Sequence, residues 1–439
     1  MAGAVLEFLP YRSFRLISHL NLIHIEFLVA GLLMLVRMHN KSSRRSAAGF
    51  GLVIGLTYLT DLTYTTFLVL AATAFALVHA RTTFTRAGLE RWGVAASVGL
   101  IVSLPLLIPM IADVVHHEAP VAHGSGGADY YSADLFSWIT PNADDPLLGS
   151  DSRWLSDTVT GSEHTAYTGV IVVALGVVGA LLHDKRRRVW LSIVGLFGLL
   201  ALGPYLHVWG HTGRAPGSGS IPLPYHVLQK LPVFNSSRSP GRFGVMASIG
   251  LVMLACIALD ALRRRRPRVG LVVLVLYAVV TLVEFSPRSQ WVLQASAVPA
   301  PYAAMKESSK SGAVLDIPLQ WRDGFRFYGD TVANRDDTVF IYAASIDRAA
   351  VGGTVSRMTS PRLALLQRKK VYRDILILQG DLPAPSGWKP SFGREDLRTL
   401  GISFVIYHAE RPMPNVLAYI ERLGLKKFAT DGVVTTWQA

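Results

Sequence analysis

Residues 244–262 read GVMASIGLVMLACIALDAL, a run in which Asp260 is the only charged side chain. A helix of about 20 apolar residues has the length that crosses the hydrocarbon core of a bilayer. Similar runs recur along the chain, in which 51% of the residues are hydrophobic and 17% are charged, with a mean hydropathy of +0.35. This composition is too apolar for a soluble chain of 439 residues. The sequence therefore predicts an α-helical polytopic membrane protein.

The apolar runs predict about eight transmembrane helices. They are expected at 20–36, 49–60, 62–79, 92–112, 167–183, 189–206, 240–262 and 269–285. The stretch 49–79 is too long for one crossing, because a single helix over these residues would extend about 46 Å across a core of about 30 Å. Two short helices that turn at TYLTDLTYT fit better, and a re-entrant segment is the alternative.

Basic residues concentrate in four short loops between these runs. The loops at 37–48, 81–91, 184–188 and 263–268 hold sixteen Lys and Arg against two acids, Glu90 and Asp184. The long loop 113–166 has the opposite balance, with one arginine and nine acids. Short basic loops stay on the cytoplasmic side of a membrane. The loop 113–166, the segment 207–239 and the tail from 286 are therefore expected outside, and the net charge of +13 indicates membrane orientation and no nucleic-acid partner.

The tail changes to a globular composition and divides the chain into a transmembrane helical domain, 1–285, and a C-terminal extracytoplasmic α/β domain, 286–439. Strands are predicted at 312–319, 402–408 and 432–438, which are short runs bounded by glycine or proline. Helical spacing falls between them, at about 361–380, 395–400 and 413–424. This order predicts a small mixed sheet with helices.

Two arginines flank the start of the seventh run, in NSSRSPGRF (235–243). Pro240 suits the first turn of a helix, and the N–H groups at an open helix start attract anions. Arg238 and Arg242 add forked donors of the kind that bind phosphate. A phosphate-binding site at the outer mouth is one interpretation; anchoring to lipid phosphate is the other.

Three further residues are candidates for a cavity within the helices. His19 and Glu26 fall about 20° apart on one helical face if the first crossing begins before residue 20. A carboxylate facing lipid is costly, so Glu26 either pairs with a polar group of a neighbouring helix or lines a substrate cavity. Asp61 lies at the turn of the predicted hairpin, where it either caps the second helix or orients a sugar hydroxyl.

The loop HHEAPVAHGSGGAD brings together His116, His117, Glu118, His123 and Asp129. Such side chains bind divalent metal ions, but their spacing matches no tight metal motif. An ordinary loop is the alternative, and no metal ligand is assigned. Cys256 is the single cysteine, which excludes an intrachain disulfide.

Several stretches together resemble a known superfamily: FLPYRSFRLISHLNLIHIEFLVAGLLMLVR, GLTYLTDLTYTTFLVL, LPVFNSSRSPGRFGVMASIGLVMLACIALDAL and the tail segments VLDIPL, GGTVSRM and LGISFVIYH. They are similar to bacterial membrane proteins of the GT-C superfamily of glycosyltransferases, including YfhO-like and protein-mannosyltransferase-like members. The resemblance covers most of the chain, and none of its motifs is diagnostic of a substrate.

The resemblance implies a sugar donor linked to polyprenyl phosphate, an acceptor outside the bacterial cytoplasmic membrane, and Arg238 and Arg242 as contacts of the donor phosphate. It also implies an acidic base in a first outer loop, and no counterpart of that loop is expected in this sequence. The N-terminus is expected outside the membrane, but no segment before the first crossing would carry it across the membrane. The chain is therefore expected to continue upstream. A transporter or flippase of lipid-linked saccharides and a non-catalytic envelope assembly protein are the alternative functions.

Overall fold

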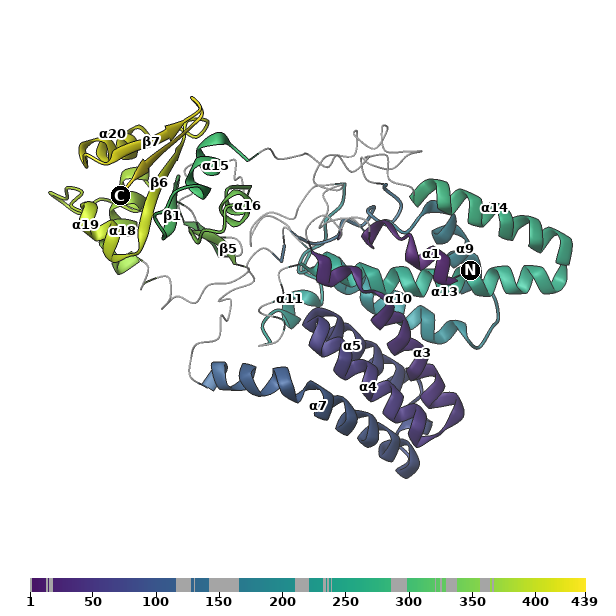
Figure 1. The fold of residues 1–439 in the computed structure, drawn as a ribbon. Helices are drawn as coiled ribbons and strands as arrows, with labels where there is room; N and C mark the ends of the chain where they lie inside the picture. The colour runs from purple at the N-terminus through teal and green to yellow at the C-terminus, as the bar shows by residue number, and fades with distance from the viewer. Residues whose placement is uncertain are drawn as a thin grey trace. The chain divides into compact units, whose positions relative to one another are not determined.

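The computed structural model describes residues 2–12, 15, 19–115, 128–129, 131–141, 166–209, 221–231, 234, 237, 239–285, 298–319, 321–323, 326–328, 338–355, 364 and 367–439. The chain forms two compact units (Figure 1). A helical unit spans 1–117 and 122–291, and a second unit contains 118–121 and 292–439. Each unit is considered by itself.

The regular structure in the described residues of the first unit is helical, apart from an isolated antiparallel β-bridge between Tyr205 and Pro222. The helices are α1 (Ala2–Glu7), η1 (Leu20–Ile23), α3 (Glu26–Lys41), α4 (Arg44–Thr60), α5 (Leu62–Val78), α6 (Ala80–Thr83), α7 (Arg86–Val115), α9 (Val170–Leu181), α10 (Arg187–Ala201), α11 (Tyr225–Leu228), η3 (Pro240–Phe243), α13 (Gly244–Arg265) and α14 (Pro267–Phe285). Every predicted crossing overlaps a helix. Three described segments, 86–115, 240–265 and 267–285, are long and apolar enough to cross a membrane by length and composition. The number of crossings beyond these three stays a prediction.

The stretch 49–79 folds as two helices, as the hairpin interpretation expects. Helix α4 ends at Thr60, α5 begins at Leu62, and Asp61 between them has an extended backbone. Each helix has 17 residues, about 25 Å at 1.5 Å per residue. Figure 1 shows the two helices next to each other.

The first predicted crossing begins later than expected. The prediction placed it at 20–36, but residues 20–23 form the short 3₁₀ helix η1 and α3 begins only at Glu26. The Tyr64 hydroxyl on α5 donates to the Leu22 carbonyl, and His19 and Asn21 bond to other elements through their side chains. These contacts between elements hold the segment out of the α-helix that its apolar pattern favours.

The core of the helical unit surrounds α13, which is buried on most of its length. Three phenylalanines join its start to two other helices: the rings of Phe67 on α5 and Phe243 on η3 lie 4.5 Å apart, and Phe197 on α10 lies 6.0 Å from Phe243. Glycines allow closer contacts, because a Cβ on Gly179 of α9 would lie 2.0 Å from the Leu254 carbonyl oxygen of α13. Because Phe243 is held by this packing, the position of the preceding residue, Arg242, is fixed as well.

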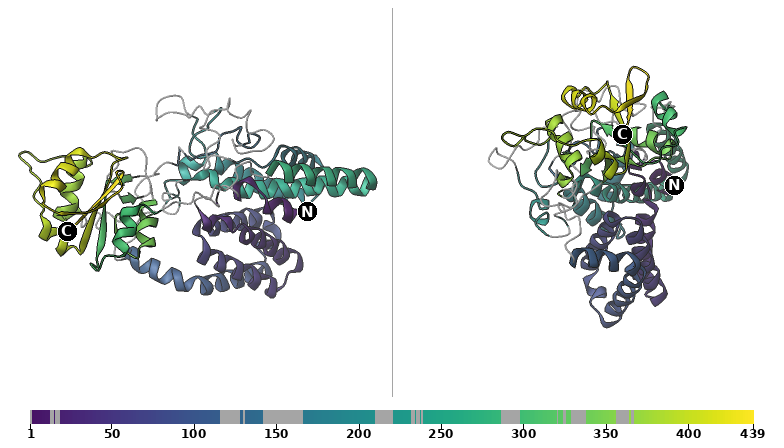
Figure 2. Two further views of the ribbon diagram at one scale, coloured as in Figure 1. Left: turned by 45° about the horizontal axis from the view of Figure 1, so that its top comes forward. Right: turned by 60° about the vertical axis from the view of Figure 1, so that its left-hand side comes forward.

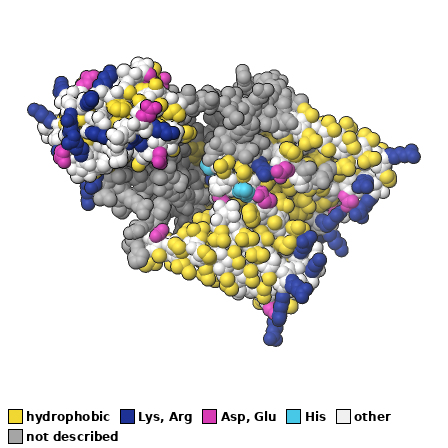
Figure 3. Space-filling model, in the orientation of Figure 1, with side chains coloured by type: hydrophobic (Ala, Val, Ile, Leu, Met, Phe, Trp, Pro, Cys, Tyr) yellow, Lys and Arg dark blue, Asp and Glu magenta, His cyan; other side chains and the backbone are white. Residues whose placement is uncertain are grey.

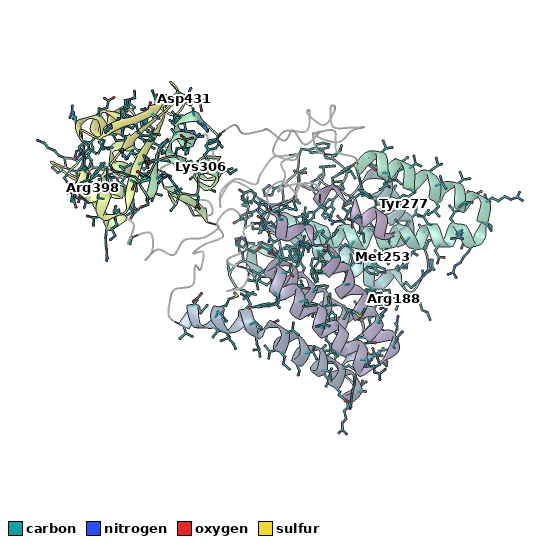
Figure 4. All side chains as sticks on the ribbon, viewed as in Figure 1. Arg188, Met253, Tyr277, Lys306, Arg398 and Asp431 are labelled. Atoms are coloured by element: carbon teal, nitrogen blue, oxygen red, sulfur yellow. The ribbon has the colours of Figure 1, made fainter. Side chains whose placement is uncertain are left out.

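The basic loops meet at one end of the helical unit. Arg44 pairs with Glu90, and the Arg91 guanidinium donates to the Ser42 hydroxyl at 2.9 Å. In the other half, Arg186 bonds to Asp260 at 2.9 Å. Figure 3 shows lysines and arginines along the right-hand and lower edges of this unit, with hydrophobic side chains over much of the remaining visible surface. Figure 4 places Arg188 near the beginning of α10, and Met253 and Tyr277 within α13 and α14.

The second unit is a mixed α/β layer structure, as predicted. Its elements are α15 (Ala300–Lys306), β1 (Ala313–Ile317), β2 (Trp321–Asp323), β3 (Arg326–Tyr328), α16 (Thr338–Ser345), β4 (Ala350–Val351), β5 (Gly353–Val355), α18 (Lys370–Gln379), α19 (Arg394–Thr399), β6 (Ile402–His408), α20 (Pro414–Arg422), β7 (Lys426–Thr430) and β8 (Val434–Gln438). The three strands predicted from the sequence correspond to β1, β6 and β8. The three predicted helices correspond to α18, α19 and α20.

Five of these strands form one sheet in the order β4-β1-β6-β8-β7. Strands β4, β1 and β6 are parallel, and β8 and β7 complete the sheet in antiparallel pairs. One face packs on α18, α19 and α20 through Ile375, Leu397 and Ile420. The other face packs on α15 through Tyr302 and on α16 through Ala343. The left view of Figure 2 shows the strands of this unit with helices on both sides.

Candidate functional site

A group of polar side chains lies at the end of the helical unit opposite the basic loops. We call His19, Asn21, Asp61, Tyr64 and Arg242 the polar cluster. Two helices show this position. Helix α4 begins at Arg44 and ends next to Asp61, and α13 begins just after Arg242 and ends in arginines at Arg265. The cluster joins residues that are 40 and 223 positions apart in the sequence.

Asp61 is the buried carboxylate of this cluster, with 8% of its surface exposed. One carboxylate oxygen accepts the backbone N–H of Tyr64 at 3.0 Å, which is the bond that an N-cap residue makes. The other oxygen accepts the side-chain amide of Asn21. Asp61 therefore caps α5 and ties η1 to it; whether it also orients a sugar hydroxyl stays a prediction.

Arg242 reaches across from η3 to His19, with 3.2 Å between Nη2 and the histidine Nε2. Because a guanidinium only donates, Nε2 accepts and the His19 proton resides on Nδ1. The imidazole in this contact is therefore neutral. His19 and Arg242, predicted separately as cavity and phosphate residues, stand together in the fold.

The backbone N–H groups at this helix start are not open to an anion, contrary to the expectation for NSSRSPGRF. Pro240 has no N–H, the Gly241 N–H donates to the Tyr131 carbonyl at 3.0 Å, and the Arg242 N–H donates to the Ser239 carbonyl at 3.1 Å. Protein carbonyls therefore take the positions that a phosphate was expected to occupy. What remains of the predicted phosphate site is the Arg242 side chain, since Arg238 lies outside the described residues.

The expectation that His19 and Glu26 share one helical face is wrong. Glu26 is the first residue of α3, and His19 precedes a separate 3₁₀ turn. The Glu26 side chain is 56% exposed and pairs with His24 at 2.7 Å between Oε1 and Nδ1. A carboxylate in the first turn of a helix is favoured by the helix dipole, so Glu26 is an accessible acid at the helix start.

Two residues of the cluster's surroundings were missed from the sequence. Arg15 is 2% exposed, and its guanidinium carbon lies 4.8 Å from the centre of the Tyr11 ring. The Tyr11 hydroxyl is 3.5 Å from that of Tyr64, whose electrostatic neighbours include both Arg15 and Asp61. In the sequence, the only sign of Arg15 as a functional residue was that Arg12 and Arg15 precede the first apolar run. Arginines at that place are ordinarily interpreted as anchors at the membrane interface.

Glu284 is a second buried carboxylate that the sequence did not indicate. It lies at the end of α14 and is 4% exposed. Its Oε1 accepts the Val170 N–H at 3.1 Å and the Tyr167 hydroxyl. Glu284 therefore caps α9, as Asp61 caps α5, and holds α9 to α14.

The candidate metal loop falls largely outside the described residues, which exclude His116, His117, Glu118 and His123. Asp129 is described and bonds to His207 Nε2 at 2.9 Å. Within the described ranges no three His, Cys, Asp or Glu side chains gather in a way that could hold a metal ion.

A largely apolar cavity of about 540 Å³ lies between α4, α5 and α7. Phe84 and Trp92 line it near the basic loops, and Tyr58 and Leu107 line it toward the opposite end. The cavity thus extends along the helices from the basic end toward the end that carries the polar cluster.

Comparisons with known proteins give a fold and a family. The mycobacterial arabinofuranosyltransferase AftD, solved by cryo-electron microscopy, matches the whole of this chain with a TM-score of 0.54 and 13% sequence identity. The match covers 31% of AftD, so the chain spans under a third of that protein. At this identity the likeness shows a shared fold, and the GT-C and YfhO-like resemblance of the sequence stays a prediction.

No curated protein matches the sequence. A family model described as a domain of unknown function, DUF6311, matches residues 1–286. This range takes in more than half of the chain and all the helices of the first unit. The protein is therefore a member of the DUF6311 family.

Proposed function

We propose that the protein is a membrane glycosyltransferase, or part of one, that moves a sugar from a polyprenyl-phosphate donor to an extracytoplasmic acceptor. The observation that carries the proposal is the contact between Arg242 and His19 at 3.2 Å, opposite the basic loops. It sets a guanidinium beside a neutral imidazole at the predicted outer end of a helical unit. The fold shared with a glycosyltransferase supports the same assignment.

Arg242 is the proposed contact of the donor phosphate, together with Arg238. In this reaction an acceptor hydroxyl attacks the anomeric carbon, the bond from that carbon to the phosphate oxygen breaks, and the acceptor proton passes to a base. A guanidinium stabilises the charge that builds on the departing phosphate. His19 orients the Arg242 side chain, because its neutral Nε2 accepts a guanidinium N–H.

Glu26 is the better candidate for a general base among the two predicted acids. Both oxygens of Asp61 already accept hydrogen bonds from the protein, whereas the Glu26 side chain is more than half exposed. A base has to reach the hydroxyl that it deprotonates. Asp61 accordingly has the role of holding α5 and η1 in place.

The apolar cavity between α4, α5 and α7 is the proposed location of the isoprenoid chain of the donor. Its lining is predominantly hydrophobic, and it runs along the helices toward the polar cluster. Ala96 of α7 lines the cavity and is exposed, so a tryptophan there can occupy the space without displacing a core residue. We expect Ala96→Trp to weaken binding of a long polyprenyl phosphate more than that of a short analogue.

The test of the donor site is binding of a labelled polyprenyl phosphate to the purified full chain in nanodiscs. Hydrogen bonds to charged groups contribute about 1.5–3 kcal/mol, so Arg242→Ala is expected to weaken binding about tenfold to a hundredfold. Arg242→Lys should recover little, because it keeps the charge and loses the fork. Arg265→Ala is the matched control, since Arg265 is exposed at the opposite end of α13.

If wild type and Arg242→Ala bound the polyprenyl phosphate with equal affinity, Arg242 would be an anchor to lipid phosphate and not a donor contact. Movement of an intact lipid-linked saccharide across the bilayer, with no cleavage of the sugar–phosphate bond, would favour the transporter instead.

A further inference from the structure

Three buried polar side chains meet in the second unit, at the carboxyl ends of two parallel strands. Asp316 is the penultimate residue of β1, and His408 is the last residue of β6. These neighbouring strands pair Asp316 with Ile406 and Ile317 with Tyr407. Tyr302 joins them from α15. We call Tyr302, Asp316 and His408 the carboxyl-edge cluster.

The contacts within this cluster leave one carboxylate oxygen unused. Asp316 Oδ1 accepts the Tyr302 hydroxyl at 2.5 Å and lies 2.9 Å from His408 Nε2, which is also 3.1 Å from the Tyr302 hydroxyl oxygen. Asp316 is 4% exposed, and its Oδ2 is buried without a hydrogen-bond partner. A buried polar atom left without a partner destabilises the folded state, and more so when it is charged. In this cluster the unpartnered atom is Asp316 Oδ2.

The connections that follow β1 and β6 also indicate a binding position at the carboxyl ends of these strands. From β1 the chain goes through α16 to β4, on one side of β1, and α16 covers one face of the sheet. From β6 it goes through α20 to β7 and β8, on the other side, and α20 covers the opposite face. The two connections therefore leave adjacent parallel strands in opposite directions. Open α/β sheets bind ligands outside the carboxyl ends of such strands.

The charges at this edge indicate what kind of ligand fits. Arg411 follows β6, is partly exposed, and interacts electrostatically with Asp316 and Tyr302. Its positive charge opposes a metal cation beside Asp316, and the Asp316 carboxylate opposes an anion beside Arg411. A neutral ligand that both donates and accepts hydrogen bonds satisfies both groups. Hydroxyl groups have this property.

We infer that the carboxyl ends of β1 and β6 form a saccharide-binding site, in which Asp316 Oδ2 accepts a sugar hydroxyl and Arg411 donates to a sugar oxygen. Ala409 and Glu410, between His408 and Arg411, are exposed, so this edge of the sheet lies at the surface of the unit. The residues of this site belong to the second unit, whereas the polar cluster belongs to the helical unit, and the inference does not depend on sugar transfer.

The test is titration of the full chain with D-glucose, D-galactose, D-mannose and D-arabinose. The protein is held in nanodiscs and kept free of maltoside detergents, whose headgroups would compete, and binding is followed by calorimetry. We expect saturable binding of at least one sugar and none of Ca²⁺ or sulfate. Asp316→Asn replaces the accepting oxygen by a donor and is expected to weaken sugar binding at least tenfold.

Arg411→Gln provides a second variant at a partly exposed position, in case Asp316→Asn unfolds the unit, and is also expected to lose at least tenfold. Glu410→Gln, one residue away and exposed, should bind as wild type does. Arg242→Ala should also bind sugar normally, which separates failure of this site from failure of the donor site. Absence of sugar binding, equal binding by Arg411→Gln, or binding of Ca²⁺ or sulfate in place of sugar would overturn the inference.

Discussion

At the scale of single residues, the helical unit uses buried carboxylates as caps. Asp61 accepts from the Tyr64 N–H and from Asn21, and Glu284 accepts from the Val170 N–H. The first N–H groups of a helix have no partner within the helix, and within a membrane no water replaces one. A carboxylate at such a place is therefore explained by capping before any catalytic role is needed.

Substitution of Asp61 separates these two roles. Asp61→Ala removes the cap of α5 and the partner of Asn21, and is expected to lower the free energy of unfolding by about 1–2 kcal/mol. Asp61→Asn keeps an oxygen for the Tyr64 N–H and should recover most of this loss. Thermal unfolding in nanodiscs measures both. If Asp61→Asn kept the stability of wild type yet lost donor binding, the capping explanation would be insufficient.

Asp396 gives the second unit a dependence on pH. Its Oδ2 accepts the Gly393 N–H at 2.7 Å and the Lys370 ammonium at 3.1 Å, and these two contacts hold the pKa of Asp396 below its ordinary value. A carboxyl whose pKa is lowered on folding contributes stability above its ordinary pKa of about 3.9, and this contribution disappears as the pH falls through the folded value.

We therefore expect Asp396→Asn to speed hydrogen exchange in residues 393–400 at pH 6, relative to wild type at the same pH. At pH 3 the difference between the two proteins should shrink, because the wild-type carboxyl begins to protonate. Glu395→Gln is the control, since the Glu395 side chain is 84% exposed. A difference that stays constant from pH 6 to pH 3 would contradict the assigned ionisation.

At the scale of elements, glycines decide which helices touch. Gly51 and Gly55 lie four residues apart on α4 and face α7. A Cβ on Gly51 would come within 2.2 Å of the Ala95 carbonyl oxygen, and one on Gly55 within 2.5 Å of Val102 Cβ. Small residues at this spacing let membrane helices approach closely. The spacing is visible in the sequence, but the partner helix is not.

Gly51→Ala is expected to push α4 from α7 and to destabilise the protein by about 1–3 kcal/mol, the usual cost of an added group in a packed interface. Gly93→Ala is the matched control on α7, because nothing lies within 4 Å of a Cβ there. In the helix interior alanine is favoured over glycine by roughly 0.5–1 kcal/mol, so the control should melt at or above the wild-type temperature. Equal melting of the two variants would show that the α4–α7 contact is not tight.

At the scale of the helical unit, the positions of the four basic loops agree with the orientation predicted from the sequence. Arg44 and Glu90 join the first two loops, and Arg186 of the third loop bonds to Asp260, which lies on α13 three residues before the fourth loop. Val189, just after the third loop, packs with Met38 and Ala47 beside the first loop. Segments that stay on one side of a membrane have to lie at one end of the helices that they connect. The pairing satisfies this condition, and the side of the membrane itself stays a prediction.

Reporter fusions decide that side. A reporter that is active only outside the cytoplasm is expected to work after residue 150 and after residue 439, and to fail after residue 266. The physical reason is that Lys and Arg in short loops resist translocation. Inactive fusions at 150 and 439, with protein levels equal to those of the fusion at 266, would reverse the assignment.

The sequence by itself determined the helices, the basic loops and the main strands of the second unit, because each rests on local information. A run of about 20 apolar residues predicts a membrane helix, and short runs bounded by glycine or proline predicted the strands found at 313–317, 402–408 and 434–438. Arg242 was also identified locally, from its place beside Pro240. The apolar pattern failed at residues 20–25, where hydrogen bonds from other elements replaced the expected α-helix by a 3₁₀ turn.

Only the tertiary structure decided which polar residues meet. His19 and Arg242 are 223 residues apart, and Asp316 and His408 are 92 apart. Neither pair has a spacing that a helix or a strand repeats. They are brought together by packing, in one case of Phe67, Phe197 and Phe243 around the start of α13, and in the other by the parallel pairing of β1 with β6. Such contacts depend on the shape of the whole core, so no local pattern in the chain records them.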